Sequence, residues 1–132
     1  MTSGRCDRNV ILDSCVAGAD LSGKQGYFCT LAAGKVATVS TAATEKLHGV
    51  IYGEPTTSGE PVEVAVDGEV SLITDGNAVD IAVGDWLTTD ASGRAIKCTT
   101  DKQVIRAVAL EAATEANYYI QARLVGPFTA SI

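Results

Sequence analysis

The chain has 132 residues, of which 46% are hydrophobic and 20% charged, a composition that fits one folded domain and excludes a largely disordered chain. Its 16 acidic and 10 basic residues give a formal charge of −6. This balance excludes general nucleic-acid binding, because neutralising phosphates requires an excess of Lys and Arg. Aromatic residues make up only 5%, so the core must be built from Val, Ile, Leu and Ala.

The N-terminal segment, residues 1–16, is predicted to be an extended arm. Arg5 and Arg8 precede a short apolar run at residues 10–12, which is a superficial match to a secretory signal. Asp13 ends this run before it reaches the length that a signal requires, so we expect no cleaved signal. No other stretch is long and uncharged enough to cross a bilayer, and we expect no membrane partner.

Short β-favouring segments separated by turn residues follow along the rest of the chain. Residues 61–66 alternate, with three valines on one face, which is typical of a half-buried strand. Asp67 and Gly68 form a dipeptide favoured in tight hairpin turns, so residues 69–74 are expected to return as the partner strand. The other predicted strands cover residues 27–31, 35–40, 48–52, 85–89, 94–98, 103–110 and 118–125.

Helix-favouring composition occurs only at residues 111–116, which is enough for one short turn. The sequence therefore predicts an all-β fold, a small β-barrel or β-sandwich of short antiparallel strands with an extended N-terminal arm. No linker or low-complexity tract divides the chain into further domains.

Acidic residues are concentrated in the middle of the chain. From Leu47 to Gly93 there are nine carboxylates and no Lys or Arg, while the flanks together sum to +3. A solvated, water-facing surface is the simplest interpretation of such a run. A calcium site is the alternative, but the alternating spacing of an EF-hand loop is absent.

The four cysteines, Cys6, Cys15, Cys29 and Cys98, contain no C-x-x-C pair. Structural zinc sites usually take their thiolates from such close pairs, and the single histidine, His48, does not complete one, so we expect no metal site. These cysteines could be free thiols packed in the core, or they could form disulfide bonds; the sequence fits both.

A phosphate-binding loop is matched in outline by residues 18–24, which read G-x-x-x-x-G-K. The motif requires Ser or Thr next, where this chain has Gln25, and a following helix, where residues 27–31 favour a strand. Nothing near His48 in the sequence forms an acid–base or nucleophile constellation. We therefore expect no catalytic residues, no bound cofactor and no enzyme activity.

Six short motifs in a fixed order carry a resemblance to a known family. They are Leu47-His48-Gly49-Val50-Ile51, the glycine and valine pattern of residues 58–70, Val83-Gly84-Asp85-Trp86-Leu87-Thr88, Gly93-Arg94-Ala95, Val108-Ala109-Leu110-Glu111-Ala112 and Tyr119-Ile120-Gln121-Ala122-Arg123-Leu124. From about residue 17 to residue 125, this order resembles that of the small capsid decoration, or cement, proteins of tailed bacteriophages. Turn glycines and strand valines dominate these motifs, so they specify a fold more firmly than an activity.

The resemblance implies a structural viral protein with a decoration domain at residues 17–132. Such a protein would be made in the host cytoplasm, bind the outer surface of a phage head in the virion, and stabilise contacts between major capsid proteins. The resemblance also implies a homo-oligomer, in particular a homotrimer. The alternative is a non-viral β-barrel module that binds other proteins without catalysis.

The N-terminal arm is not part of the shared pattern. We expect it to reach a neighbouring subunit or the shell, with Arg5 and Arg8 meeting carboxylates there. The predicted interface residues are Arg5, Arg8, Val10, Ile11, Leu12 and Phe128.

Overall fold

The computed structural model describes residues 10–77 and 79–131, and within these ranges it contains nine strands and no helix. The predicted all-β fold is confirmed. The strands are β1 (Val10–Ala17), β2 (Phe28–Ala32), β3 (Val36–Val39), β4 (Gly49–Tyr52), β5 (Pro61–Asp75), β6 (Trp86–Thr89), β7 (Ala95–Lys97), β8 (Val104–Ala109) and β9 (Ala116–Thr129).

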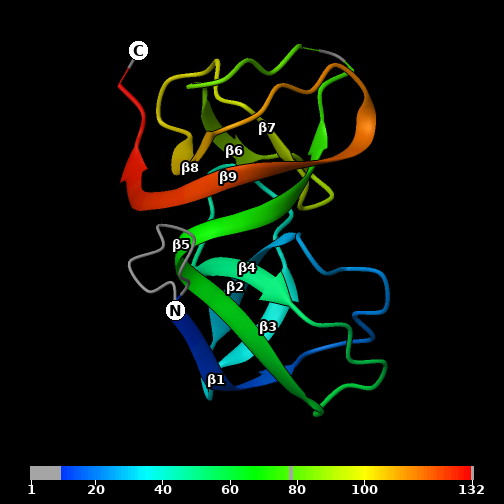
Figure 1. The fold of residues 1–132 in the computed structure, drawn as a ribbon. Helices are drawn as coiled ribbons and strands as arrows, with labels where there is room; N and C mark the ends of the chain where they lie inside the picture. Colours follow the sequence, from blue (N-terminus) through cyan, green and yellow to red (C-terminus); the bar gives the residue numbers. More distant parts are fainter. Residues whose placement is uncertain (1–9, 78, 132) are drawn as a thin grey trace, which may run out of the picture.

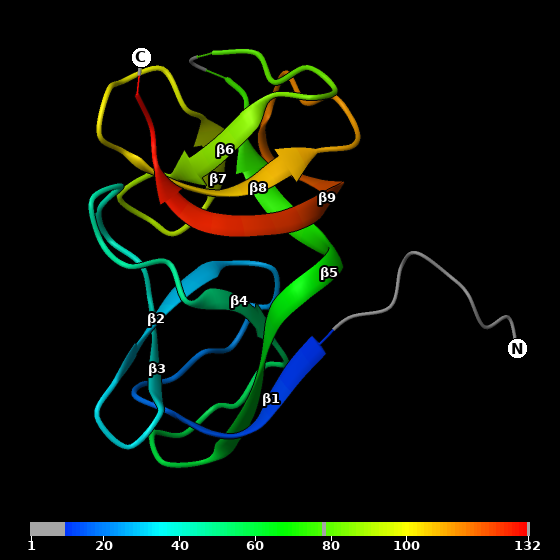
Figure 2. The same cartoon turned by 90° about the vertical axis from the view of Figure 1, so that its left-hand side faces the viewer.

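The strands close into two small barrels that share β5. The first barrel has the order β1-β3-β2-β4-β5 and closes because β1 also pairs with the first half of β5. The second has the order β5-β7-β6-β8-β9 and closes because β9 pairs with the second half of β5. Figure 1 shows the first barrel below the second with β5 running through both, and Figure 2 shows the same stacking from the side. Of the two predicted architectures, the barrel is therefore the one observed.

The second barrel repeats the pairing of the first, strand for strand. The pairs β1–β3 and β5–β7 are parallel and the other eight pairs are antiparallel. The register recurs at a spacing of 58 residues, since Phe28 pairs with Val50 as Trp86 pairs with Val108. Positive φ angles recur at the same spacing, in the pairs Gly26 and Gly84, Lys35 and Gly93, Gly59 and Asn117, and Gly68 and Gly126. The chain thus contains an internal structural repeat.

Each barrel has its own apolar core, made by side chains that alternate inward along the strands. Cys29, Ile51 and Val64 fill the first barrel, and their counterparts 58 residues later are Leu87, Ala109 and Ala122 in the second. A row on the outside of the first barrel, Phe28, Val50 and Ala65, is packed into the core cluster of the second barrel. This row joins the two barrels.

The predicted hairpin turn at Asp67 and Gly68 is wrong. β5 continues through both residues: Asp67 pairs with Val10 of β1, and Gly68 pairs with Leu124 of β9. Gly68 has a φ of +92°, as the turn chemistry suggested, but there it lets the strand leave one barrel and enter the other. Residues 69–74 accordingly pair with β9 and β7 rather than with residues 61–66.

The structure places residues 10–16 in β1, not in an arm. β1 pairs with β5 from Val10 to Val16 and with β3 at Val16 and Ala17, so these residues are part of the first barrel. Residues 111–116 contain no helical turn. Residues 111–115 form a loop whose Ala113 makes an isolated bridge with Ile81, and Ala116 begins β9.

The three cysteines in the described residues form no disulfide bond. Cys15 and Cys29 are buried in the first barrel and Cys98 is partly exposed, whereas Cys6 lies outside the described residues. Burial raises the pKa of Cys29 to about 12, the neighbouring Cys15 thiol adds to this shift, and Arg106 opposes it. The Cys29 thiol is therefore protonated and unreactive at neutral pH.

Candidate interaction surface

Exposed aromatic side chains gather on the outer side of the second barrel. Trp86 at the start of β6 is 49% exposed and Phe128 near the end of β9 is 42% exposed. Their rings pack edge to face, with centroids 5.4 Å apart. Aromatic rings that remain half exposed beside each other are typical of binding surfaces, because their burial releases much apolar area.

Two further side chains continue this surface across the sheet. Trp86 pairs with Val108 of β8, which in turn pairs with Arg123 of β9. Directly opposite residues on neighbouring strands point to the same side of a sheet, so all three face outward. We call the surface formed by Trp86, Val108, Arg123 and Phe128 the aromatic face.

Phe128 takes part in lining two shallow hollows. One is lined by Trp86, Cys98, Ile105 and Phe128 together with the chain end at Ala130 and Ser131. The other is lined by Lys46, Val104, Pro127, Phe128 and Thr129. Phe128 therefore lines two depressions, which a partner's side chains could fill.

The other predicted interface residues are only partly available to a partner. Val10 is 53% exposed, but Ile11 and Leu12 are half buried and pack against the cores of the second and first barrels. Arg5 and Arg8 lie outside the described residues. Of the four predicted interface residues that the structure describes, only Phe128 lies on the aromatic face.

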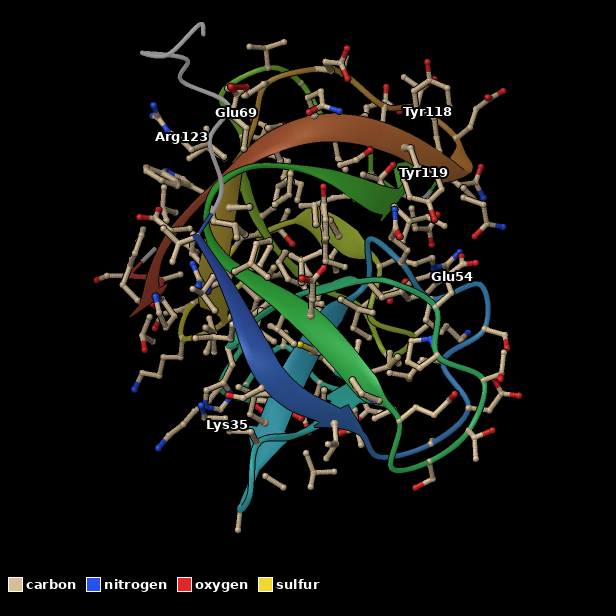
Figure 3. All side chains as sticks on the ribbon, turned by 60° about the horizontal axis from the view of Figure 1, so that its bottom comes forward. Lys35, Glu54, Glu69, Tyr118, Tyr119 and Arg123 are labelled. Atoms are coloured by element: carbon tan, nitrogen blue, oxygen red, sulfur yellow. The ribbon has the colours of Figure 1, made fainter. Side chains whose placement is uncertain are left out.

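Two exposed tyrosines, Tyr118 and Tyr119, lie near the start of β9, away from Arg123, as Figure 3 shows. Tyr119 donates a hydrogen bond from its hydroxyl to the Gln25 carbonyl at 2.8 Å, which ties β9 to the loop before β2. Burial raises the pKa of Tyr119 above its ordinary value, and Tyr27 and Glu54 add to the shift. Tyr119 thus has a structural contact within the chain, whereas Tyr118 is 50% exposed beside it.

Sequence reasoning missed a buried arginine between the barrels. Arg106 of β8 is 4% exposed. It donates hydrogen bonds to four carbonyl oxygens: Leu47 at 2.8 Å, His48 at 3.1 Å, Val66 at 2.7 Å and Val125 at 2.9 Å. Burial lowers the pKa of Arg106, while Asp67 and Cys29 oppose the shift. Its acceptors come from segments of both barrels, so the guanidinium holds the two barrels together.

The acidic middle of the chain is used partly for internal contacts. Asp75 and Asp90 hold Arg94 at 3.1 Å and 2.9 Å. Glu60 accepts hydrogen bonds from backbone amides of the loop before β5, and Asp85 accepts one from the Ala82 amide. Among residues 10–77 and 79–131 no group of three His, Cys, Asp or Glu side chains is placed to hold a metal ion. The remaining carboxylates of the run are exposed, as expected of a water-facing surface, except Glu69, which is half buried.

The glycine-rich segment at residues 18–24 leads into a strand. Lys24 lies over the ring of Tyr27, with its Nζ 4.8 Å from the centroid, and β2 begins at Phe28. A phosphate-binding loop would need a helix N-terminus in this place. Within the described ranges there is also no helix that could span a membrane.

Fold and surface together define a class of protein: an all-β double barrel whose strands pair into closed rings and which presents an aromatic face. A family profile described as phage cement protein matches residues 21–124, which span parts of both barrels. The chain therefore belongs to the phage cement protein family and is a structural protein of phage, associated with the capsid. The family assignment favours this role over that of a non-viral interaction module.

A solved structure with the same fold is the head fiber gp8.5 N base of bacteriophage phi29. The two match with a TM-score of 0.60 and 17% sequence identity, over 95% of this chain and 100% of that one. At this identity the likeness shows the fold alone. No curated protein sequence matches the chain.

Proposed function

We propose that the protein binds the outer surface of a phage head and holds neighbouring major capsid proteins together, without catalysis. The observation that carries this proposal is the family match over residues 21–124. The closed barrels support it, because closed rings leave few unpaired strand edges. The protein would then contact the shell through its side chains, and not by pairing one of its strand edges with a strand of the capsid protein.

The physical need for such a protein follows from the contents of the head. Packaged DNA pushes outward on the shell, and extra interface buried between neighbouring capsomers raises the free energy required to separate them. A homotrimer would multiply a modest interface through avidity, since several copies bind one shell at once. The protein would be made in the host cytoplasm and end on the outer surface of the virion.

The head-binding proposal predicts that added protein makes undecorated heads harder to break. We expect the protein to co-sediment with heads at micromolar concentration, and to raise the temperature at which decorated heads release their DNA, because separating capsomers must also break the added interface. Co-sedimentation and DNA-release curves with and without the protein measure both effects. Heads that bind the protein but release DNA at an unchanged temperature would contradict the stabilising role.

Arg5 and Arg8 provide a test of the N-terminal contact. Exchanging both for serine should weaken head binding most at low salt, because charge pairs at a surface are screened as ionic strength rises. The control is Lys35→Ser, which removes one positive charge from the first barrel, where the Lys35 ammonium donates a hydrogen bond to the Ser14 hydroxyl. Equal binding by the arginine variant and the control at low salt would argue against a contact through these arginines.

A further inference from the structure

The internal repeat gives the aromatic face an exact counterpart elsewhere in the molecule. In the first barrel, Phe28 pairs with Val50 and Val50 pairs with Ala65. At 58 residues further along, Trp86, Val108 and Arg123 pair in the same way. The outward row of the first barrel and the aromatic face are therefore the same surface on two successive barrels.

The two surfaces differ in what covers them. Phe28, Val50 and Ala65 are 0%, 1% and 0% exposed, because the second barrel packs on them. The Phe28 amide also donates a hydrogen bond to the Gly93 carbonyl of the second barrel at 2.9 Å. In the second barrel the equivalent row is only partly covered within the described residues: Trp86 is 49% exposed and Arg123 is exposed, while Val108 is half buried. In the first barrel this surface is thus buried by the next barrel along the chain.

The side chains around the aromatic face give it a basic rim. Lys46 lines the hollow beside Phe128, and Lys102 lies next to the other hollow, where its amide bonds the Ala130 carbonyl. Neither these lysines nor Arg123 form an ion pair within the described residues, although Glu69 lies opposite Arg123 on β5 (Figure 3). Most of the other cations have partners inside the chain, including Arg94 with two carboxylates and Arg106 with four carbonyls.

We propose that the aromatic face is the surface that docks on the phage shell, and that its occupant is an acidic surface with an apolar centre on the capsid protein. The proposal rests on the proposed head binding. Trp86 and Phe128 would enter the apolar centre, while Lys46, Lys102 and Arg123 would meet carboxylates around it.

A second copy of this chain is a poorer occupant. The part of the second barrel that covers the Phe28 row, around Gly93, is occupied in each copy by its own first barrel. Another copy could offer that surface only by opening its two barrels. A different protein is therefore needed to cover the aromatic face in a similar way.

The test compares head binding by Trp86→Ser, Arg123→Glu and Tyr118→Ser. Tyr118 is a matched control, because it is as exposed as Trp86 but lies near the start of β9, away from Arg123 of the aromatic face. We expect Trp86→Ser to bind heads about 30-fold more weakly, the loss typical of an anchor residue, and Arg123→Glu to lose affinity most at low salt. Tyr118→Ser should bind like the wild type. Circular dichroism checks that each variant is folded.

Wild-type protein that fails to sediment with heads would overturn the proposed function and this inference with it. Wild-type binding that neither Trp86→Ser nor Arg123→Glu weakens would overturn this inference alone.

Trp86 is the only tryptophan, so acrylamide quenching of its fluorescence reports on the exposure of the aromatic face in the absence of heads. Quenching that stays high as protein concentration rises supports the proposal. Protection that grows with self-association, and is lost in Arg123→Glu, would identify a second copy as the occupant and contradict it.

Discussion

Replacing Arg106 with methionine is expected to destabilise the protein by about 3–5 kcal/mol, because it removes a buried guanidinium that donates to four carbonyl oxygens. Leu47, His48, Val66 and Val125 would lose these hydrogen bonds, and methionine offers no donor in return. Urea unfolding of the wild type and the variant measures the difference in the free energy of unfolding.

Two comparisons make this prediction specific. Arg106→Lys should recover only part of the loss, since an ammonium has three donors at one point and cannot span four acceptors as a planar guanidinium does. Arg123→Met removes an arginine that is exposed on β9 and should change stability by less than about 0.5 kcal/mol. A loss below about 1 kcal/mol for Arg106→Met would show that Arg106 does not hold the barrels together.

Replacing Gly49 with alanine is expected to cost about 3 kcal/mol, although it adds only one methyl group. A Cβ at Gly49 would collide with the Ala65 carbonyl oxygen and lie 2.7 Å from Val64 Cγ1. Both neighbours belong to β5, which is shared by the two barrels and cannot shift without disturbing both. Thermal and urea unfolding measure the loss.

The repeat supplies the control for this substitution. Ala107 occupies the equivalent position in the second barrel, where it pairs with Leu87 as Gly49 pairs with Cys29. Ala107→Gly should cost about 1 kcal/mol, through the lost methyl and added chain entropy. If Gly49→Ala proved no more costly than Ala107→Gly, the close approach of β4 and β5 would be refuted.

The positions of most strands could be predicted from the sequence, because alternation and turn residues act over a few residues. The predicted segment 94–98, for example, contains β7, and 103–110 contains β8. What the strands pair with could not be predicted in this way. Asp67 and Gly68 have the chemistry of a hairpin turn, yet the partners of β5 come from both ends of the chain.

The internal repeat left almost no trace in the sequence. Equivalent positions keep their burial and register but rarely their identity: Cys29 corresponds to Leu87, and Ile51 to Ala109. Barrel interiors select for volume and polarity, so many apolar residues satisfy the same place. The repeat became visible only through the strand pairing and the recurring positive φ angles.

The candidate surface was partly foreseeable. Phe128 is among the predicted interface residues, whereas Trp86 is not, although it is the only tryptophan and lies near the start of a predicted strand. Arg106 also carried a signal, as a single charge within the apolar strand β8. Its role depended on carbonyls from three distant segments, and local sequence does not bring these together.

A cryo-electron microscopy reconstruction of decorated heads tests the central claim most directly, because it shows both where the protein binds and which side it presents. The account predicts density for both barrels on the outside of the head, bridging neighbouring major capsid proteins, with Trp86 and Phe128 turned toward the shell. Density inside the head, or no added density on heads incubated with the protein, would contradict it.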